Sequence, residues 1–195
     1  NQPKADGRVD YDFPDAKQHL TLSGAYMRDS GIFLYSMGPA TLDDCGAGYG
    51  KMDYVRGALR ITGYANITGW KGANLLWVDP AGQPIPTDGH NQMYHVEFGD
   101  SRTVHAKHLI SYGASFRHNE FNLAYAPEAE KRDEGGAYIQ DEIIFSRHIR
   151  WVVGTRVDKF DNLEDVVFSP RTALIVKPVP SHTFRVSYNR AFMAP

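Results

Sequence analysis

The sequence predicts an all-β protein whose antiparallel strands follow one another as a meander, each with one apolar and one polar face. Residues 135–195 show this best, because four runs of alternating apolar and polar residues lie back to back there. In the second run, Trp151, Val153 and Val157 alternate with Arg156 and Asp158. Such alternation places successive side chains on opposite faces of a strand. The runs have about 10 to 12 residues, the length that a tilted strand needs to cross a lipid bilayer.

The composition leaves a membrane barrel open and argues against nucleic acid as the partner. The chain has 195 residues and a formal charge of −2, so it lacks a concentrated basic surface. No run of about 18 apolar residues predicts a transmembrane helix. A barrel strand, however, buries only every second residue in lipid and gives a weak hydropathy signal. The first residues are not typical of a signal peptide, so a signal was removed or the segment begins within a longer protein.

Weaker alternation predicts further strands before residue 135. Residues 7–13 and 19–27 each predict a strand, and residues 93–104 and 107–117 predict a strand pair. Residues 54–67 predict one long strand, in which the arginines face away from the aliphatic side chains. Together with the closing meander this gives about nine or ten strands.

Segments rich in Gly, Pro or charge predict loops between these strands. They are residues 31–50, with a short strand through 32–35 as an option, and residues 79–91, 126–134 and 161–166. The links at residues 146–148 and 178–182 are shorter. Alternation of long and short connections is typical of membrane barrels.

Four short motifs stand in order in the closing meander. They are Tyr138/Gln140/Asp141, Gly154/Arg156/Asp158, Ser169/Pro170/Arg171, and Arg185/Ser187/Tyr188 followed by Phe192/Ala194/Pro195. Each motif is weak alone, but the set in this order resembles the barrel of TonB-dependent outer-membrane receptors. The motifs cover about a third of the chain. The part before them is similar to the family only in its alternating strands and its long Gly- and Asp-rich loops.

The resemblance implies a fold and a function. Members of the family are 22-stranded barrels filled by an N-terminal plug domain. They lie in the outer membrane of Gram-negative bacteria and import scarce nutrients such as ferric siderophores, cobalamin or oligosaccharides with energy from TonB. This chain contains no plug and no TonB-contacting segment, so we expect residues 1–195 to be an internal part of the barrel domain. The implied partners are TonB through that absent plug, a nutrient ligand and outer-membrane lipid.

Arginines on the predicted polar faces are the candidate site residues. In a wide barrel they would pack against carboxylates of the plug or line the substrate path, or they would only solvate the inner wall. The resemblance further implies that the four predicted loops are outer loops and that the two short links lie on the periplasmic side. The aromatic residues of the apolar faces are expected to contact lipid or form a girdle. The candidate arginines are Arg56, Arg60, Arg156, Arg171 and Arg185.

Two residues do not follow the simple pattern. Asp141 falls on the otherwise apolar face of residues 137–145, so it lies above the membrane rim or pairs locally. Cys45 has no partner cysteine in this chain, so it is a plain loop residue or bonds to a cysteine outside this stretch.

The sequence predicts no catalytic centre, metal site or cofactor. His105 and His108 would point to opposite faces of a strand, and no Cys or carboxylate completes a ligand set. The Ser, His and Asp residues form no recognisable nucleophile motif, so we expect the protein not to be an enzyme.

Two alternatives to the receptor remain at this stage. One is a smaller passive porin or adhesin barrel in the same membrane. The other is a secreted soluble β-sandwich that binds carbohydrate, with Trp70, Trp77 and Tyr94 as a stacking platform.

Overall fold

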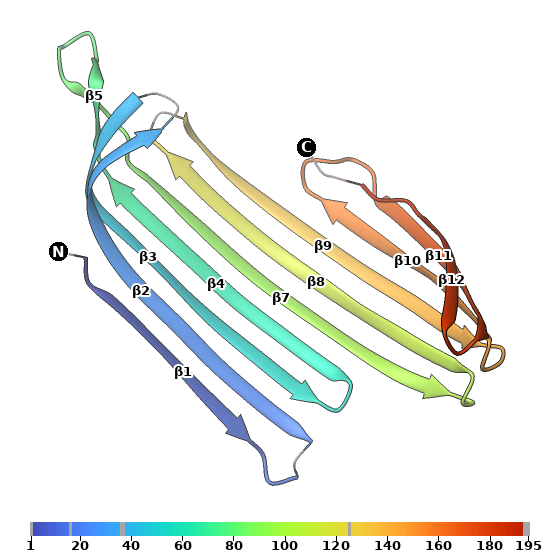
Figure 1. Ribbon diagram of the computed structural model, residues 1–195. Coiled ribbons are helices and arrows are strands. Elements are labelled where there is room, and N and C mark those ends of the chain that lie inside the picture. The colour runs from blue at the N-terminus through green and yellow to red at the C-terminus, as the bar shows by residue number, and fades with distance from the viewer. Residues whose placement is uncertain (1, 16, 36–37, 125, 193–195) are drawn as a thin grey trace. The chain divides into compact units, whose positions relative to one another are not determined.

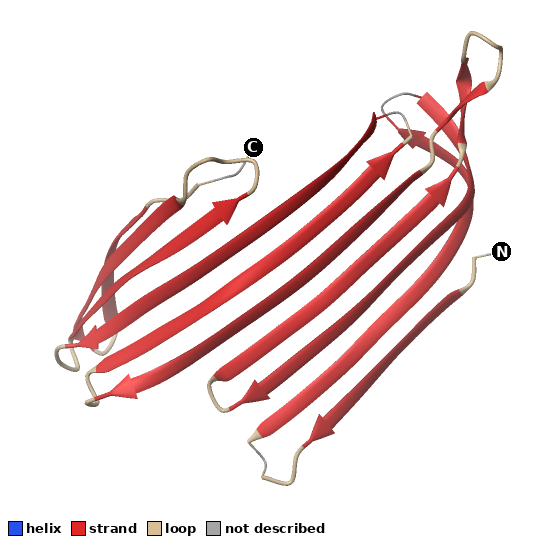
Figure 2. Cartoon of the chain, turned by 180° about the vertical axis from the view of Figure 1, so that it is seen from behind, coloured by secondary structure: helices blue, strands red, loops and turns tan. Residues whose placement is uncertain are grey.

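The computed structural model describes residues 2–15, 17–35, 38–124 and 126–192. Every regular element among them is a β-strand, and Figure 2 accordingly shows strands and loops. This part of the chain holds no helix that is long and apolar enough to cross a membrane. The strands are β1 (Lys4–Asp12), β2 (Gln18–Tyr35), β3 (Gly38–Arg56), β4 (Leu59–Lys71), β5 (Ala73–Val78), β6 (Pro84–Pro86), β7 (Gly89–Val104), β8 (His108–Leu123), β9 (Ala126–Ile144), β10 (Ile149–Phe160), β11 (Val167–Val179) and β12 (His182–Asn189).

The strands form one sheet in the order of the chain. Neighbours along the main path are β1-β2-β3-β4-β7-β8-β9-β10-β11-β12, and the short strand β5 pairs with β3 and β6. The pairs β1–β2, β9–β10, β10–β11 and β11–β12 are antiparallel. The predicted all-β antiparallel meander is therefore confirmed. A sandwich would need two sheets packed face to face, and the described residues form a single sheet instead.

Contacts between Cα atoms divide the chain into two compact units. Unit 1 consists of Asn1–Tyr54, Thr62–His95 and Arg117–Arg132. Unit 2 consists of Val55–Ile61, Val96–Phe116 and Asp133–Pro195. Several long strands contribute residues to both units, and each unit is described by itself.

In unit 2 the strands β9 to β12 follow one another in the sheet (Figure 1), and their register separates two faces. Trp151 lies opposite Ile143 on β9 and Leu174 on β11, and Leu174 lies opposite Val186 on β12. These side chains share one face because directly opposed residues of antiparallel strands point the same way. The predicted apolar face of the closing meander is therefore present across four strands.

In unit 1 the same separation holds for β1 and β2. Val9 lies opposite Leu22, and Tyr11 lies opposite Leu20, on one face. Asp10 lies opposite Thr21 on the other face. The strands predicted at residues 7–13 and 19–27 are confirmed, and β2 extends to Tyr35, well beyond the prediction.

Three predictions from the sequence are wrong. Residues 54–67 are not one strand, because Gly57, with φ of 60°, lies in the turn between β3 and β4. Residues 31–50 and 126–134 are not loops, because β2, β3 and β9 run through their described parts. The strands were missed because Gly and charged residues have low strand propensity and give no apolar alternation there.

Other predictions of connections hold. Residues 161–166 link β10 to β11, and residues 146–148 lie within the link between β9 and β10. Only residues 180–181 separate β11 from β12. The prediction of a loop at residues 79–91 holds only in part, because β6 and the first residues of β7 lie within it.

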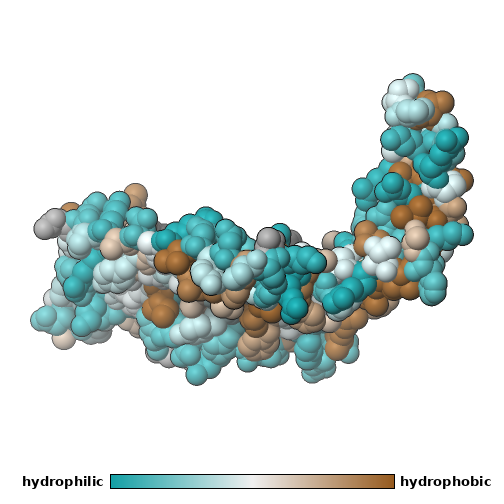
Figure 3. All heavy atoms as spheres, turned by 90° about the horizontal axis from the view of Figure 1, so that it is seen from below, coloured by the Kyte–Doolittle hydropathy of each residue, from teal (hydrophilic) through white to brown (hydrophobic). Residues whose placement is uncertain are grey.

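Few apolar side chains are buried. Among the described residues, only Ala40 and Ala173 are hydrophobic and less than a tenth exposed, at 3% and 4%. Large apolar side chains such as Leu174, Val186 and Phe184 remain 45%, 75% and 62% exposed. In the view of Figure 3, apolar residues (brown) lie uncovered among hydrophilic ones. A sheet with so much exposed apolar surface needs another apolar phase to cover it.

Candidate functional site

Three of the five candidate arginines share one face of unit 2. Arg171 lies opposite Gly154, which alternation places on the same face as Arg156. Arg185 lies opposite Ile175, which shares that face of β11 with Arg171. The polar face predicted for the closing meander is thus continuous over β10, β11 and β12. A role of these arginines in lining a lumen or contacting a plug remains a prediction.

Local partners hold Arg156 in place. Its Nε donates hydrogen bonds to both carboxylate oxygens of Asp158, at 2.8 and 2.9 Å. Its NH2 group lies 3.3 Å from the Ser115 hydroxyl oxygen on β8. A Cβ at Gly136 would lie 2.6 Å from the same NH2 group, so this position on β9 has no room for a side chain. Arg156 is therefore a fixed positive group rather than a freely rotating one.

Tyr138 occupies space on this face that glycines leave open. A Cβ at Gly113 would lie 2.7 Å from Tyr138 Cε1 and would also press on the carbonyl oxygen of Phe98. A Cβ at Gly99 would lie 3.0 Å from the Tyr138 hydroxyl. The ring of Tyr138, a residue of the first motif, therefore packs over Gly99 of β7 and Gly113 of β8.

The other two candidate arginines do not share a face. Arg56 ends β3 and Leu59 begins β4, with a two-residue turn between them. In such a hairpin the two flanking residues face each other and point the same way, so Arg60 points the opposite way to Arg56. The expectation that both lie on the polar face depended on a single strand and is wrong.

A second polar cluster, which the sequence analysis did not identify, lies in unit 1. Arg8 donates to both carboxylate oxygens of Asp10, at 2.7 and 2.8 Å. The Thr21 hydroxyl donates to Asp10, and His19 Nδ1 lies 2.6 Å from Asp12 Oδ1. The signal was present, because charged residues stand at every second position from 6 to 12. We name Arg8, Asp10, Asp12, His19 and Thr21 the β1–β2 polar cluster.

A shallow groove of about 540 Å³ lies beyond this cluster in unit 1. Its lining includes the neutral polar side chains Asn66, Thr68 and Asn91, together with Tyr49 and Met93. Asn66 and Thr68 share a face of β4 with Thr62, whose hydroxyl donates to Asp53 at 2.8 Å. Amide and hydroxyl groups of this kind bind uncharged hydrogen-bonding solutes.

The positions of side chains in unit 1 contradict two further predictions, a carbohydrate platform that includes Trp70 and Tyr94, and a loop position for Cys45. Tyr64 of β4 stacks on His95 of β7 with ring centroids 4.9 Å apart. Alternation then places Trp70 on the same face and Tyr94 on the opposite one, so these two aromatics cannot form one carbohydrate platform. Cys45 lies within β3 rather than in a loop, half-buried, and is a free thiol in the described chain.

No group of three or more His, Cys, Asp or Glu side chains in the described ranges is placed to hold a metal ion. His105 lies in the turn between β7 and β8 with φ of 50°, and it does not join His108 in a strand.

A comparison with known protein families identifies the family of this chain. The family described as TonB dependent receptor-like, beta-barrel matches residues 3–195. This chain belongs to the TonB-dependent receptor family. The match covers the first two-thirds of the chain as well as the motif-bearing meander, so the resemblance inferred from residues 135–195 is confirmed.

Solved structures of two other proteins share the fold. The FrpB iron transporter from Neisseria meningitidis (F3-3 variant) aligns with a TM-score of 0.72 at 15% identity, over 96% of this chain and 36% of that one. The siderophore receptor PirA from Pseudomonas aeruginosa aligns with a TM-score of 0.73 at 14% identity, over 100% and 34%. This receptor chain thus spans about a third of the length of these proteins. A comparison with curated proteins found no match.

The structure of the receptor chain also answers the question about Asp141. Asp141 lies opposite Val153 on the apolar face, and its Oδ2 lies 2.6 Å from His108 Nδ1. Its Oδ1 is buried without a hydrogen-bond partner. The carboxylate therefore pairs locally on the apolar face of the closing meander.

We expect the His108–Asp141 pair to be coupled energetically. His108→Leu should destabilise the receptor because it leaves a carboxylate on an apolar face without its partner. The double variant His108→Leu/Asp141→Val should recover most of the loss, because both polar groups are then gone. The interaction free energy is measured by urea unfolding in lipid vesicles of the wild type, His108→Leu, Asp141→Val and the double variant. We expect it to be at least about 0.5 kcal/mol. Additive effects of the two single substitutions would show that the pair is not coupled.

Proposed function

We propose that this chain forms part of an outer-membrane transport receptor of a Gram-negative bacterium. The receptor takes up a scarce nutrient with energy supplied by TonB through a plug domain that lies outside this chain. The observation that carries the proposal is the two-faced antiparallel meander in a chain that matches the receptor barrel family over residues 3–195.

The exposed apolar face supports a position in a membrane. Leu174, Val186 and Phe184 in unit 2, and Val9 and Leu22 in unit 1, are 45–75% exposed. In water this surface would drive aggregation, whereas lipid would cover it favourably. The strands β2, β3 and β9 have 18, 19 and 19 residues, so they exceed the roughly 9–11 residues needed to span a bilayer. We assign their excess length to the outer side, where it carries the substrate-contacting surface.

The polar face supports a water-filled interior. In this arrangement Arg156, Arg171 and Arg185 line the inner wall, where they meet carboxylates of the plug or of the substrate. In unit 1, the β1–β2 polar cluster and the polar groove, whose lining also includes Lys4 and Asp6, likewise suit an aqueous surface. The short links at residues 146–148 and 180–181 lie on the periplasmic side, and residues 161–166 lie on the outer side.

A ferric siderophore is the first substrate to test. The solved structures with this fold include one named as an iron transporter and one named as a siderophore receptor. Cobalamin and oligosaccharides are the other candidates from the family.

We expect uptake to require both this protein and TonB. In iron-limited cells, accumulation of a radiolabelled ferric siderophore should fall to background when the gene is deleted, and equally when TonB is deleted. A plasmid copy should restore uptake only in the strain that has TonB. A panel with cobalamin and oligosaccharides should identify the substrate if siderophores give no signal.

The same uptake assay distinguishes an active receptor from a passive porin barrel. Solute entry that is lost with the gene but kept without TonB would identify a passive porin, and the active-transport proposal would be wrong. If no detergent is needed to extract the protein from cells, the membrane position itself is wrong.

A further inference from the structure

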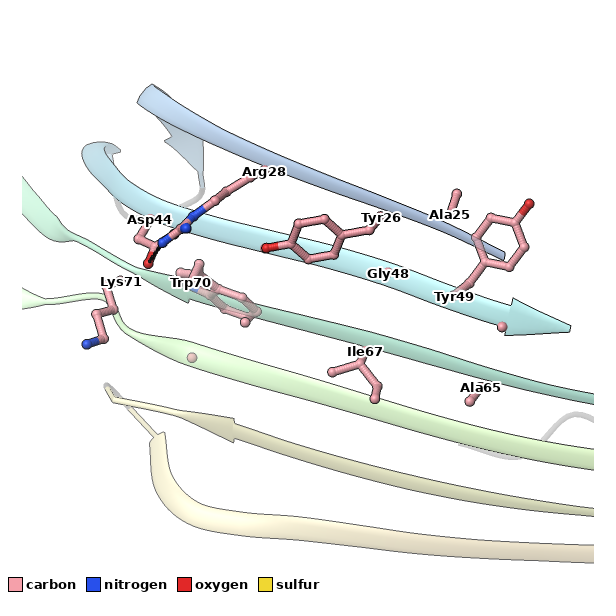
Figure 4. Close-up of a pocket in the computed structure, with 14 residues that line it drawn as sticks. Ala25, Tyr26, Arg28, Asp44, Gly48, Tyr49, Ala65, Ile67, Trp70 and Lys71 are labelled. Carbon is pink, nitrogen blue, oxygen red and sulfur yellow. Dashed lines mark hydrogen bonds and ion pairs between the residues drawn. The ribbon is translucent and has the colours of Figure 1, made fainter. Parts of the chain in front are cut away.

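A groove of about 750 Å³ lies on the apolar face of unit 1 and shares four lining residues, Tyr26 and Gly48 among them, with the polar groove described above. Its floor contains Gly46, Gly48 and Gly50, which follow one another at every second position of β3. Tyr26 of β2 lies over this row, because a Cβ at Gly46 would stand 3.2 Å from its hydroxyl and one at Gly48 would stand 3.4 Å from its ring. Ile67 forms another part of the lining (Figure 4).

The groove is continuous with exposed apolar surface. Tyr26 shares a face of β2 with Leu22, and these side chains are 52% and 46% exposed. Ile67 on β4 is 47% exposed. An aqueous solute would gain little in such a groove, whereas a hydrocarbon chain would cover the apolar lining.

One end of the groove carries charged side chains. There Arg28 of β2 pairs with Asp44 of β3 through two hydrogen bonds of 2.6 Å, and Figure 4 shows the two side chains together. Lys71 at the end of β4 lies at the same end of the groove. Lys71 makes no hydrogen bond or close ion pair with the described residues, although its charge acts on Asp44. Asp29 and Asp43 line an adjoining pocket with Arg28 and Asp44, so Lys71 is the cation of the groove lining that no close carboxylate of the described residues pairs.

We propose that this groove binds an anionic membrane lipid, with an acyl chain along the glycine row and a phosphate against Lys71. The inference rests on the proposed membrane function, because only then does this face meet lipid. The Lys71 ammonium complements a phosphate, and the apolar channel complements hydrocarbon, so the two parts fit one amphipathic molecule. The Arg28–Asp44 pair holds Arg28 in position, so Lys71 is the cation that remains available.

The test uses the natural protein that contains this chain, purified in detergent and loaded with phosphatidylglycerol or phosphatidylcholine. Native mass spectrometry counts the lipids retained by each protein. We expect preferential retention of phosphatidylglycerol and a loss of about fivefold in Lys71→Ala, the effect typical of one basic residue at a lipid head group. Lys51→Ala is the matched control, because Lys51 pairs with Asp53 at 2.8 Å and lies outside the groove lining.

A second variant tests the channel. Gly50→Leu should fill the groove without a clash, because no atom lies within 4 Å of a Cβ at this position. We expect retention of phosphatidylglycerol to fall at least as much as in Lys71→Ala. Gly7→Leu is the control, because Gly7 also has open space at its Cβ but does not line the groove.

The outcomes distinguish this inference from the proposed function. Equal retention of both lipids, or retention unchanged by both groove variants, would overturn the lipid site. A change of oligomeric state in Gly50→Leu instead of lipid loss would assign the groove to a second copy of the protein, and the lipid proposal would be wrong. In both cases TonB-dependent uptake by the same protein would leave the receptor function standing.

Discussion

Leu174→Arg is expected to destabilise the membrane-inserted protein by roughly 2–4 kcal/mol, the cost of a charge on the lipid side of a barrel near the bilayer midplane. The directly opposed residues on the neighbouring strands are Trp151 and Val186, so no carboxylate is placed to pair with the new guanidinium. Urea unfolding of the natural protein in lipid vesicles measures the difference. In cells, the amount of heat-modifiable folded protein in the outer membrane should fall in parallel.

The matched control is Val152→Arg on β10. Val152 lies opposite Glu142 and Ala173, so alternation places it on the polar face, next to a carboxylate. We expect its stability to stay within about 0.5 kcal/mol of the wild type, as for substitutions on a solvated surface. Equal losses in the two variants would mean that the two faces do not differ in environment, which contradicts the barrel assignment.

Gly113→Val is expected to cost about 1–3 kcal/mol through overpacking. Its Cβ would meet the Tyr138 ring at 2.7 Å and the carbonyl oxygen of Phe98, and backbone cannot move aside as a flexible side chain can. The same unfolding assay measures the loss. Gly7→Val is the control, because no atom lies within 4 Å of a Cβ there, and we expect almost no change.

A double substitution identifies which neighbour causes the loss. Removing the ring in Tyr138→Ala/Gly113→Val should relieve part of the strain, whereas the contact with the Phe98 carbonyl remains. We therefore expect partial and not full recovery relative to Tyr138→Ala alone. Full additivity of the two substitutions would show that Tyr138 is not seated on Gly113.

The alternating pattern predicted β10, β11 and β12 well because each has one apolar and one polar face. The pairs Trp151–Leu174 and Leu174–Val186 follow from that alternation once the strands are antiparallel neighbours. The motif residues Tyr138 and Arg156 likewise identified the family before any contact was known. The face shared by Arg156, Arg171 and Arg185 was predictable for the same reason.

Two predictions failed in the part of the chain before residue 135: the face shared by Arg56 and Arg60, and the assignment of strand segments as loops. Arg56 and Arg60 seemed to share a face because the turn at Gly57 has no Pro or Asn to mark it, and periodicity alone reads through it. The residues of β2, β3 and β9 that were predicted as loops are stabilised by pairing with neighbouring strands, so their own Gly and charged side chains give no strand signal.

By itself the sequence determined the all-β meander, its two faces in residues 135–195 and the receptor family, because these properties depend on side-chain order along one strand. Three features were visible only in the tertiary structure. They are the packing of Tyr138 over Gly99 and Gly113, the His108–Asp141 pair, and the groove that ends at Lys71. The residues of each feature are distant in the chain and meet through the register of neighbouring strands. Register depends on the hydrophobic patterns of two neighbouring strands together and on the turn that joins them, so the order of side chains along a single strand does not specify it.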